Sequence, residues 1–364
     1  MSLVLDNICH TVNGESFLTN INLTLESGSF NVLLGRTLAG KTTLMRLIAG
    51  LDRPTSGKIT LNGNDLSQVK VQERNVSMVY QQFVNYPNLT VRDNIASPLR
   101  IAKVSESEIA KRVQETAAIL QIEQFLDRYP LELSGGQQQR TSMARALVKD
   151  ASIILFDEPL VNLDYKLREE LRAELRGLFK ERNAIAIYAT TEPHEAMALG
   201  GNTTLLHEGR VIQSGAATHI YRHPETMEAA ELYSEPAINL IEGRITDNEV
   251  SLKNAAHFSI GKELEDLPKG HYVFGVLPSH IGLAPNDDDD LELSMTVELA
   301  EISGSETYIH VHNDQFSLIV QLNGVHEYHT EVPIKVYLPT HKLFVFDLHG
   351  KTIQVPSSLL KGAA

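Results

Sequence analysis

The chain has 364 residues, 42% of them hydrophobic, and its 32 Lys and Arg against 46 Asp and Glu give a formal net charge of -14. This length suffices for two domains with cores of their own, while the negative charge argues against nucleic acid as a partner and the single cysteine, Cys9, excludes an internal disulfide. The N-terminus lacks a signal segment and no apolar run reaches about 20 residues, so we expect a cytoplasmic chain, and any membrane role must come through a partner.

The first predicted elements are a strand, a loop and a helix. The apolar run 31–34 leads into Gly35, and residues 43–49 have the spacing of a helix that Gly50 terminates. From about residue 85 to 150 the strand signal fades. There Ser105 and Glu108 form a predicted capping box ahead of apolar positions at helical spacing, so we expect a helical subdomain inserted into an α/β domain.

Two further apolar runs, 152–156 and 184–188, are continuous, as is typical of parallel strands covered on both faces. Between them, leucines recur at helical spacing and predict an amphipathic helix whose charged faces we expect to be solvated. The leucines are Leu167, Leu171, Leu175 and Leu178, and the charged residues are Arg168, Glu169, Glu170, Arg172 and Glu174.

After about residue 236 the pattern changes to short alternating strands such as 308–312 and 316–320, with Gly and Asn at the turns. We therefore predict an α/β domain over residues 1–235 and a small all-β domain over residues 236–364. The four aspartates 287–290 fall between two of these strands. We interpret them as a solvated loop, with a calcium site as the alternative, although no EF-hand loop pattern surrounds them.

The first chemical motif follows the strand at 31–34 and satisfies G-x-x-x-x-G-K-S/T. Backbone N–H groups in such a loop cradle phosphates, Lys41 would reach the β- and γ-phosphates of a nucleotide, and the Thr42 hydroxyl would bind Mg²⁺. The predicted nucleotide-binding residues are Gly35, Arg36, Thr37, Leu38, Ala39, Gly40, Lys41, Thr42 and Thr43.

The second motif is an acidic pair at the end of the run 152–156. We expect Asp157 to hold magnesium and Glu158 to polarise the attacking water, as a catalytic base. An exposed acidic turn is the alternative. The compact loop that follows, residues 159–164, favours the catalytic interpretation.

The third motif is the run 133–140, Leu-Ser-Gly-Gly-Gln-Gln-Gln-Arg. Its two glycines admit a close backbone approach, and its serine opens a helix aimed at an anion, although in isolation this is also the pattern of a plain N-cap. We name Ser134, Gly135, Gly136 and Gln137 the signature segment.

With these motifs in this order, the chain resembles the ATP-binding cassette (ABC) ATPases, which are P-loop NTPases with a helical subdomain. The resemblance implies ATP and Mg²⁺ as cofactors, and a head-to-tail pair of cassettes in which each ATP lies between one phosphate loop and the other chain's signature. It assigns Gln81 to the loop that contacts magnesium and the membrane subunits, as a catalytic and metal-site residue, and 162–164 to the loop that crosses the dimer.

The C-terminal stretches 235–244 and 304–307 resemble the OB-like (TOBE/MOP) regulatory domain of maltose-type importers. Residues 35–41, 78–87 and 188–193 resemble an ATPase subunit of the bacterial glycerol importer, a maltose-type system with two different ATPase subunits. The resemblance implies two transmembrane permease subunits, an extracytoplasmic solute-binding protein and a second cassette as partners. It also implies a peripheral location on the cytoplasmic face of the inner membrane.

The chain departs from this family at three positions. Val12 stands where an aromatic ring stacks on adenine, and Leu38 replaces a glycine of the phosphate loop, which requires a backbone compatible with a β-carbon. Thr191 aligns with the histidine that contacts the γ-phosphate, and threonine cannot hold a positive charge. His194 follows Pro193 at a predicted helix start, so we expect it at the surface rather than as a replacement.

These departures predict slow hydrolysis in the chain's own site, with Thr191 in the position of a catalytic residue. We expect the chain to pair with a non-identical ATPase subunit and to lend that partner an intact signature segment. The alternative is a structural or regulatory cassette subunit that does not hydrolyse ATP. Soluble cassette proteins of translation or DNA repair, which usually carry two cassettes or a basic surface, fit this chain poorly.

Overall fold

The computed structural model describes residues 1–364 except 29, 162, 182, 254–255, 262–263 and 361–364. The chain forms two compact units, Met1–Ala217 and Thr218–Ala364. This division, after Ala217, lies earlier in the chain than the boundary after residue 235 that the sequence predicted. The reason lies in helix α8 (Met227–Tyr233), whose Ala230 packs into an apolar cluster with Phe344 and Phe346 of the second unit.

The main sheet of the first unit has the strand order β10-β9-β3-β8-β7-β6, and all of its pairs are parallel except β9 with β10. Every residue of β3, β7 and β8 is buried, which for β7 and β8 confirms the prediction from the continuous apolar runs. The strands are β3 (Phe30–Leu34), β6 (Val76–Val79), β7 (Ile153–Asp157), β8 (Ile185–Thr190), β9 (Asn202–His207) and β10 (Arg210–Ala216).

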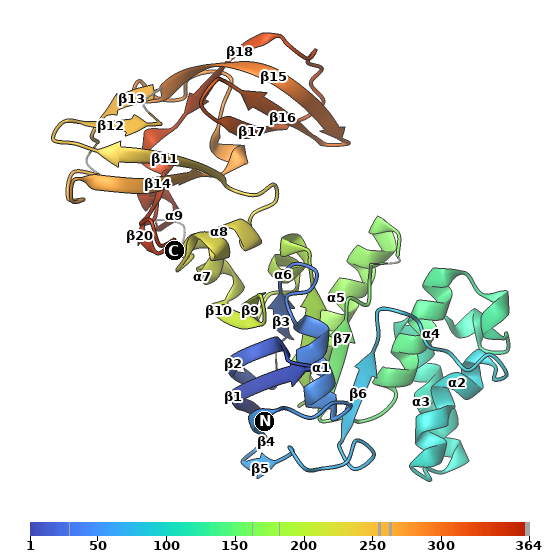
Figure 1. Ribbon diagram of the computed structural model, residues 1–364. Coiled ribbons are helices and arrows are strands. Elements are labelled where there is room, and N and C mark those ends of the chain that lie inside the picture. The colour runs from blue at the N-terminus through green and yellow to red at the C-terminus, as the bar shows by residue number, and fades with distance from the viewer. Residues whose placement is uncertain (29, 162, 182, 254–255, 262–263, 361–364) are drawn as a thin grey trace. The chain divides into compact units, whose positions relative to one another are not determined.

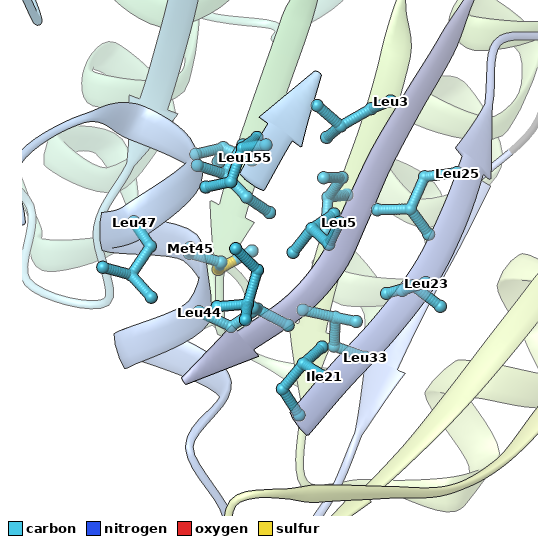
Figure 2. Close-up of a cluster of buried hydrophobic side chains, with 14 of the residues drawn as sticks. Leu3, Leu5, Ile21, Leu23, Leu25, Leu33, Leu44, Met45, Leu47 and Leu155 are labelled. Carbon is cyan, nitrogen blue, oxygen red and sulfur yellow. The ribbon is translucent and has the colours of Figure 1, made fainter. Parts of the chain in front are cut away.

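A second, antiparallel sheet of order β2-β1-β4-β5 covers helix α1 (Lys41–Ala49) from the other side. Figure 2 shows leucines from β1 and β2 in one cluster with Leu44, Met45 and Leu47 of α1 and with Leu33 and Leu155 of the main sheet. The alternation of buried and exposed residues in β2 produces this inward face. The strands are β1 (Ser2–Val12), β2 (Glu15–Glu26), β4 (Ser56–Leu61) and β5 (Asn64–Asp65).

Three helices lie between β6 and β7 in the chain: α2 (Val91–Ile101), α3 (Glu106–Ile119) and α4 (Gly135–Leu147). Figure 1 shows them grouped beside β6 and apart from α1. The predicted capping box of α3 is wrong. Ser105 does precede the helix, but its hydroxyl lies 3.3 Å from Ser107 Oγ, and Glu108 pairs with Arg112 instead of turning back to the helix start.

The amphipathic helix α5 (Tyr165–Glu181) buries Leu171, Leu175 and Phe179, whereas Leu167 and Leu178 are half-buried. The expectation that its charged residues are solvated is wrong for Arg172, which is only 8% exposed and pairs with Glu169. Helix α6 (Pro193–Leu199) follows β8.

The second unit contains two antiparallel sheets, of orders β13-β12-β11-β14-β19-β20 and β17-β16-β15-β18, around one apolar cluster. This all-β unit confirms the predicted OB-like fold class. The strands are β11 (Asn239–Ile245), β12 (Glu249–Leu252), β13 (Ala256–Ser259), β14 (Gly270–Val276), β15 (Leu291–Ser303), β16 (Glu306–His312), β17 (Ser317–Asn323), β18 (Pro333–Leu338), β19 (Phe344–Phe346) and β20 (Thr352–Gln354).

Short elements complete the fold. They are the helices α7 (Ala217–Arg222) and α9 (Ser357–Leu360) and the 3-10 turns Glu123–Phe125, Pro130–Glu132, Pro278–His280 and Thr340–Lys342. The aspartates 287–290 lie in the loop between β14 and β15, and the residues that the structure describes contain no cluster of acidic, histidine or cysteine side chains suited to a metal ion. Among all the residues that the structure describes, no helix is both long enough and apolar enough to cross a membrane.

Candidate nucleotide-binding site

The loop 35–40 connects β3 to α1 and fixes where the helix begins. Gly40 has φ 102°, and a β-carbon there would lie 2.7 Å from Leu18 Cδ2, so the position requires glycine. Its carbonyl accepts a hydrogen bond from Leu44 N (2.9 Å) and thereby opens the helix. The backbone N–H groups of the first turn have no helical acceptor, so this end of α1 favours an anion.

Lys41 points back into the loop. Its Nζ donates to Gly35 O (2.7 Å) and Arg36 O (3.2 Å) and lies 3.3 Å from Glu158 Oε1. Burial lowers the pKa of Lys41, and the charge of Glu158 opposes that shift. The ammonium is therefore held in the hollow of the loop by two carbonyls and one carboxylate.

Thr42 and Asp157 bring two oxygen-bearing side chains together across 115 residues of sequence. The Thr42 hydroxyl lies 2.9 Å from one oxygen of the Asp157 carboxylate and 3.1 Å from the other. Asp157 is buried at the end of β7, and that burial raises the pKa of its carboxyl, while Thr42 and Lys41 act in the opposite direction. A hydroxyl and a carboxylate at this spacing are the ligand types that a hard divalent cation prefers.

Glu158 follows β7 with φ 46°, and its N–H donates to Ala189 O (3.1 Å). Gln81 Nε2 donates to Glu158 Oε2 (3.2 Å). The structure thus gathers Gln81, Glu158 and Lys41 at one point, although the motifs that contain them are far apart in the sequence.

Thr191 directly follows β8 and lies at the same edge of the sheet. Its neighbour Thr190 accepts a hydrogen bond through its carbonyl from Gly35 N (3.3 Å), and Asp157 pairs in register with Ala189. The strand order therefore places Thr191 beside both the phosphate loop and the acidic pair. His194 is exposed in the first turn of α6, as the sequence indicated.

Two departures from the family pattern have distinct structural settings. Val12 is the last residue of β1 and is 41% exposed. Leu38 is 95% exposed and has φ 69°, so the expectation of a backbone that suits a β-carbon is wrong. The left-handed conformation costs a leucine about 1–2 kcal/mol relative to glycine.

The signature segment opens α4. Ser134 Oγ accepts from Gln137 N (3.4 Å), and Gln137 Oε1 accepts from Ser134 N (3.0 Å), so the two residues form a capping box. Within the described chain no hydrogen bond joins the signature segment to residues 35–43, and α4 lies apart from α1 (Figure 1). No hydrogen bond within the described part of one chain therefore brings the signature segment and the phosphate loop together.

Two residues near these motifs are absent from the sequence-based site. Gln139 is fully buried in α4, and its Nε2 donates to Pro159 O (2.8 Å), which ties the signature helix to the loop after Glu158. Its position four residues before the buried Met143 could have indicated an inward-facing side chain. Residue 162 of the expected crossing loop 162–164 lies outside the described residues. In the same loop, Asp164 Oδ1 accepts a hydrogen bond from Leu167 N (3.0 Å).

The second missed residue is Glu195 in α6. Its Oε2 accepts hydrogen bonds from Thr190 Oγ1 (2.6 Å) and Tyr188 OH (3.2 Å), and burial raises the pKa of its carboxyl. Glu195 thereby anchors the end of β8, immediately before Thr191. In sequence it is indistinguishable from an ordinary acid in the first turn of a helix.

A phosphate loop at a helix N-terminus, a buried aspartate ending a neighbouring strand and a glutamate directly after it define a P-loop nucleoside triphosphatase. Within this class, a helical subdomain whose helix α4 begins with the signature segment is typical of the ATP-binding cassettes.

Comparisons with known proteins agree. The family model described as ABC transporter matches residues 18–161. The sn-glycerol-3-phosphate import ATP-binding protein UgpC of Paraburkholderia xenovorans is 35% identical over 95% of this chain and 97% of its own length, and that of Brucella abortus is 33% identical over 96% and 99%. The dimeric, post-hydrolysis structure of the ATP-binding cassette MJ0796 bound to ADP and Pi is 30% identical, with a TM-score of 0.55, and covers 59% of this chain and 98% of that chain. The chain belongs to the ABC transporter family and is one of its ATPases.

Proposed function

We propose that this chain binds ATP together with Mg²⁺ and energises the import of a small carbohydrate or polyol of the glycerol class. The observation that carries the proposal is the convergence of Lys41, Thr42, Asp157 and Glu158 at the N-terminus of α1. The cargo class is supported by relatives named as import proteins for sn-glycerol 3-phosphate and by the resemblance to a glycerol importer subunit. Cassette residues do not touch the solute, so the cargo rests on that likeness.

Thr42 and Asp157 are the residues that would hold Mg²⁺. The fit rests on their oxygen atoms, which already lie about 3 Å apart around the buried end of β7. When bound, the ion supplies positive charge at the β- and γ-phosphate oxygens. Lys41 would then turn to the phosphates, which frees Glu158 to accept the proton of the attacking water, while Gln81 holds the other carboxylate oxygen in place.

The chain's own site is proposed to be the weaker of two. Thr191 occupies the position that needs a charge-stabilising side chain, and Val12 cannot stack on a base. The signature segment, in contrast, presents an open surface. A β-carbon on Gly135 would meet no atom closer than 4.0 Å, so the packing of this chain does not require the glycine, whereas the close approach of a partner's nucleotide does.

The proposed assembly contains a second, non-identical ATPase subunit, two permease subunits and an extracytoplasmic solute-binding protein. The chain would sit peripherally on the cytoplasmic face of the membrane. In this proposal residues 1–235 form the ATP-binding domain, and 236–364 form a regulatory or dimerisation domain.

The test is the ATPase activity of the assembled complex. Glu158→Gln should leave most of the activity, whereas the equivalent substitution in the partner should abolish it. The reverse result would show that this chain holds the stronger site. Uptake of labelled glycerol and of labelled glycerol 3-phosphate by cells with and without Lys41→Ala decides the cargo, and no loss of either uptake would contradict the importer role.

A further inference from the structure

Phe17 is displaced from the regular pairing of β1 and β2. The register joins His10 to Leu18 and Thr11 to Ser16, which leaves Phe17 as an extra residue between two paired positions. Such a β-bulge re-aims a side chain and is often found next to a functional site. Phe17 is 43% exposed, while the adjacent Leu18 is fully buried beneath Gly40.

The backbone at Phe17 lies against the phosphate loop. A β-carbon on Gly40 would be 3.3 Å from Phe17 O, and one on Gly209 would be 2.3 Å from the same oxygen. Gly209 in turn donates to Ala39 O (3.1 Å) and accepts from Thr19 N (2.9 Å). These contacts hold Phe17 beside the residues that open α1.

Phe17 is distinguished from the other exposed aromatic residues by this position. Phe83 is near Gly135, Tyr86 stacks on Arg145, and Tyr165 begins α5, whereas Tyr129 precedes a 3-10 turn in the helical subdomain. Among the exposed aromatic side chains of the described residues, Phe17 alone belongs to the strand that touches the phosphate loop. An exposed phenylalanine has no polar tip to satisfy and offers only a flat apolar face.

We propose that Phe17 stacks on the base of the nucleotide whose phosphates the loop 35–42 holds, in place of the ring that Val12 lacks. The inference rests on the proposed nucleotide site and assigns it a further binding residue. Every purine presents a π-face to a ring, so stacking adds affinity with little discrimination between bases. Mg-ATP and Mg-GTP should therefore bind similarly, and inorganic triphosphate, which has no base, should bind more weakly.

The absence of tryptophan from the chain allows a direct spectroscopic test. Phe17→Trp places the only indole of the full chain at the proposed stacking position. We expect Mg-ATP and Mg-GTP to quench its fluorescence and inorganic triphosphate to leave it unchanged. Tyr129→Trp is the matched control and should respond to none of the three. Equal fluorescence changes with Mg-ATP and triphosphate, or no change with Mg-ATP, would overturn the assignment.

Affinity gives a second, independent measurement. Phe17→Ala should weaken Mg-ATP binding about 5- to 150-fold and leave triphosphate binding unchanged, and Phe17→Tyr should restore Mg-ATP binding. Parallel weakening of both ligands would show that Phe17 only supports the loop, and unchanged Mg-ATP binding would show that it has no part. Failure of the proposed nucleotide site itself is separately visible, because the unsubstituted chain would then bind neither Mg-ATP nor triphosphate.

Discussion

Lys41 Nζ and Glu158 Oε1 lie 3.3 Å apart, so the ammonium that we propose binds phosphate and the carboxylate that we propose activates water neutralise each other. Gln81 holds the second oxygen of the same carboxylate. Both side chains of the ion pair are largely shielded from solvent, which limits screening. An incoming triphosphate must therefore take Lys41 from Glu158 before the carboxylate can act as a base.

This competition predicts that Glu158→Gln tightens ATP binding while it removes hydrolysis at the chain's own site. Loss of the competing ion pair should increase the ATP affinity of the isolated chain about 3- to 10-fold, since a pair of this exposure contributes about 1 kcal/mol. Calorimetric titration with ATP measures the change. Glu115→Gln, an exposed acid of α3, is the control and should bind as the unsubstituted chain does; an affinity of Glu158→Gln at or below that value would contradict the competition.

Thr191→His should raise the ATPase rate of the assembled complex. A positioned charge-stabilising side chain contributes about 100- to 10,000-fold at a single site, so we expect an increase of about 10-fold or more in a complex whose partner subunit carries the substitution equivalent to Glu158→Gln, where only this site turns over. Steady-state phosphate release gives the rate. An unchanged rate would favour the alternative of a cassette subunit that does not hydrolyse ATP.

Gln139→Ala should lower the stability of the first unit. The substitution removes the hydrogen bond to Pro159 O and leaves a cavity at a fully buried position, which should lower the free energy of unfolding by about 2–3 kcal/mol. Urea unfolding followed by circular dichroism measures the loss. Gln124→Ala, at an exposed position, should change stability by less than about 0.5 kcal/mol. Similar effects of the two substitutions would mean that Gln139 does not tie α4 to the loop after Glu158.

The second unit should lose stability in mild acid. Burial, Lys342 and His341 lower the pKa of His280 to about 4 from an ordinary value of 6.5. The unfolded state therefore binds more protons between these two values, so the free energy of unfolding falls as the pH drops from about 6.5 towards 4. For this partly exposed ring we expect about 2 kcal/mol between about pH 7 and 4.5. His280→Gln should flatten this part of the pH profile in urea unfolding; an unaltered slope would assign it to other groups.

The sequence pattern predicted secondary structure best where a single physical cause, the burial of apolar side chains, determines the element. The apolar runs 152–156 and 184–188 predicted buried parallel strands because both faces of such strands are covered, and the structure has them as β7 and β8 with small shifts at the ends. The prediction was wrong for charged side chains that could form a hydrogen bond or ion pair with more than one neighbour. Glu108 pairs with Arg112 instead of closing a capping box, and Arg172 is buried against Glu169 although its spacing assigned it to a solvated face.

By itself the sequence determined the class of protein and the residues of its phosphate loop, acidic pair and signature segment, because each of these motifs is contiguous and its chemistry depends on local backbone. Only the tertiary structure decided which of them meet. The strand order β3-β8-β7-β6 sets Lys41, Gln81 and Glu158 side by side, while the helical subdomain holds Ser134 elsewhere. Glu195 and Phe17 lie outside every motif, and the motif that contains Gln139 gives this residue no role. Their positions follow from packing between segments distant in the chain and, for Phe17, from one extra residue in a strand pair.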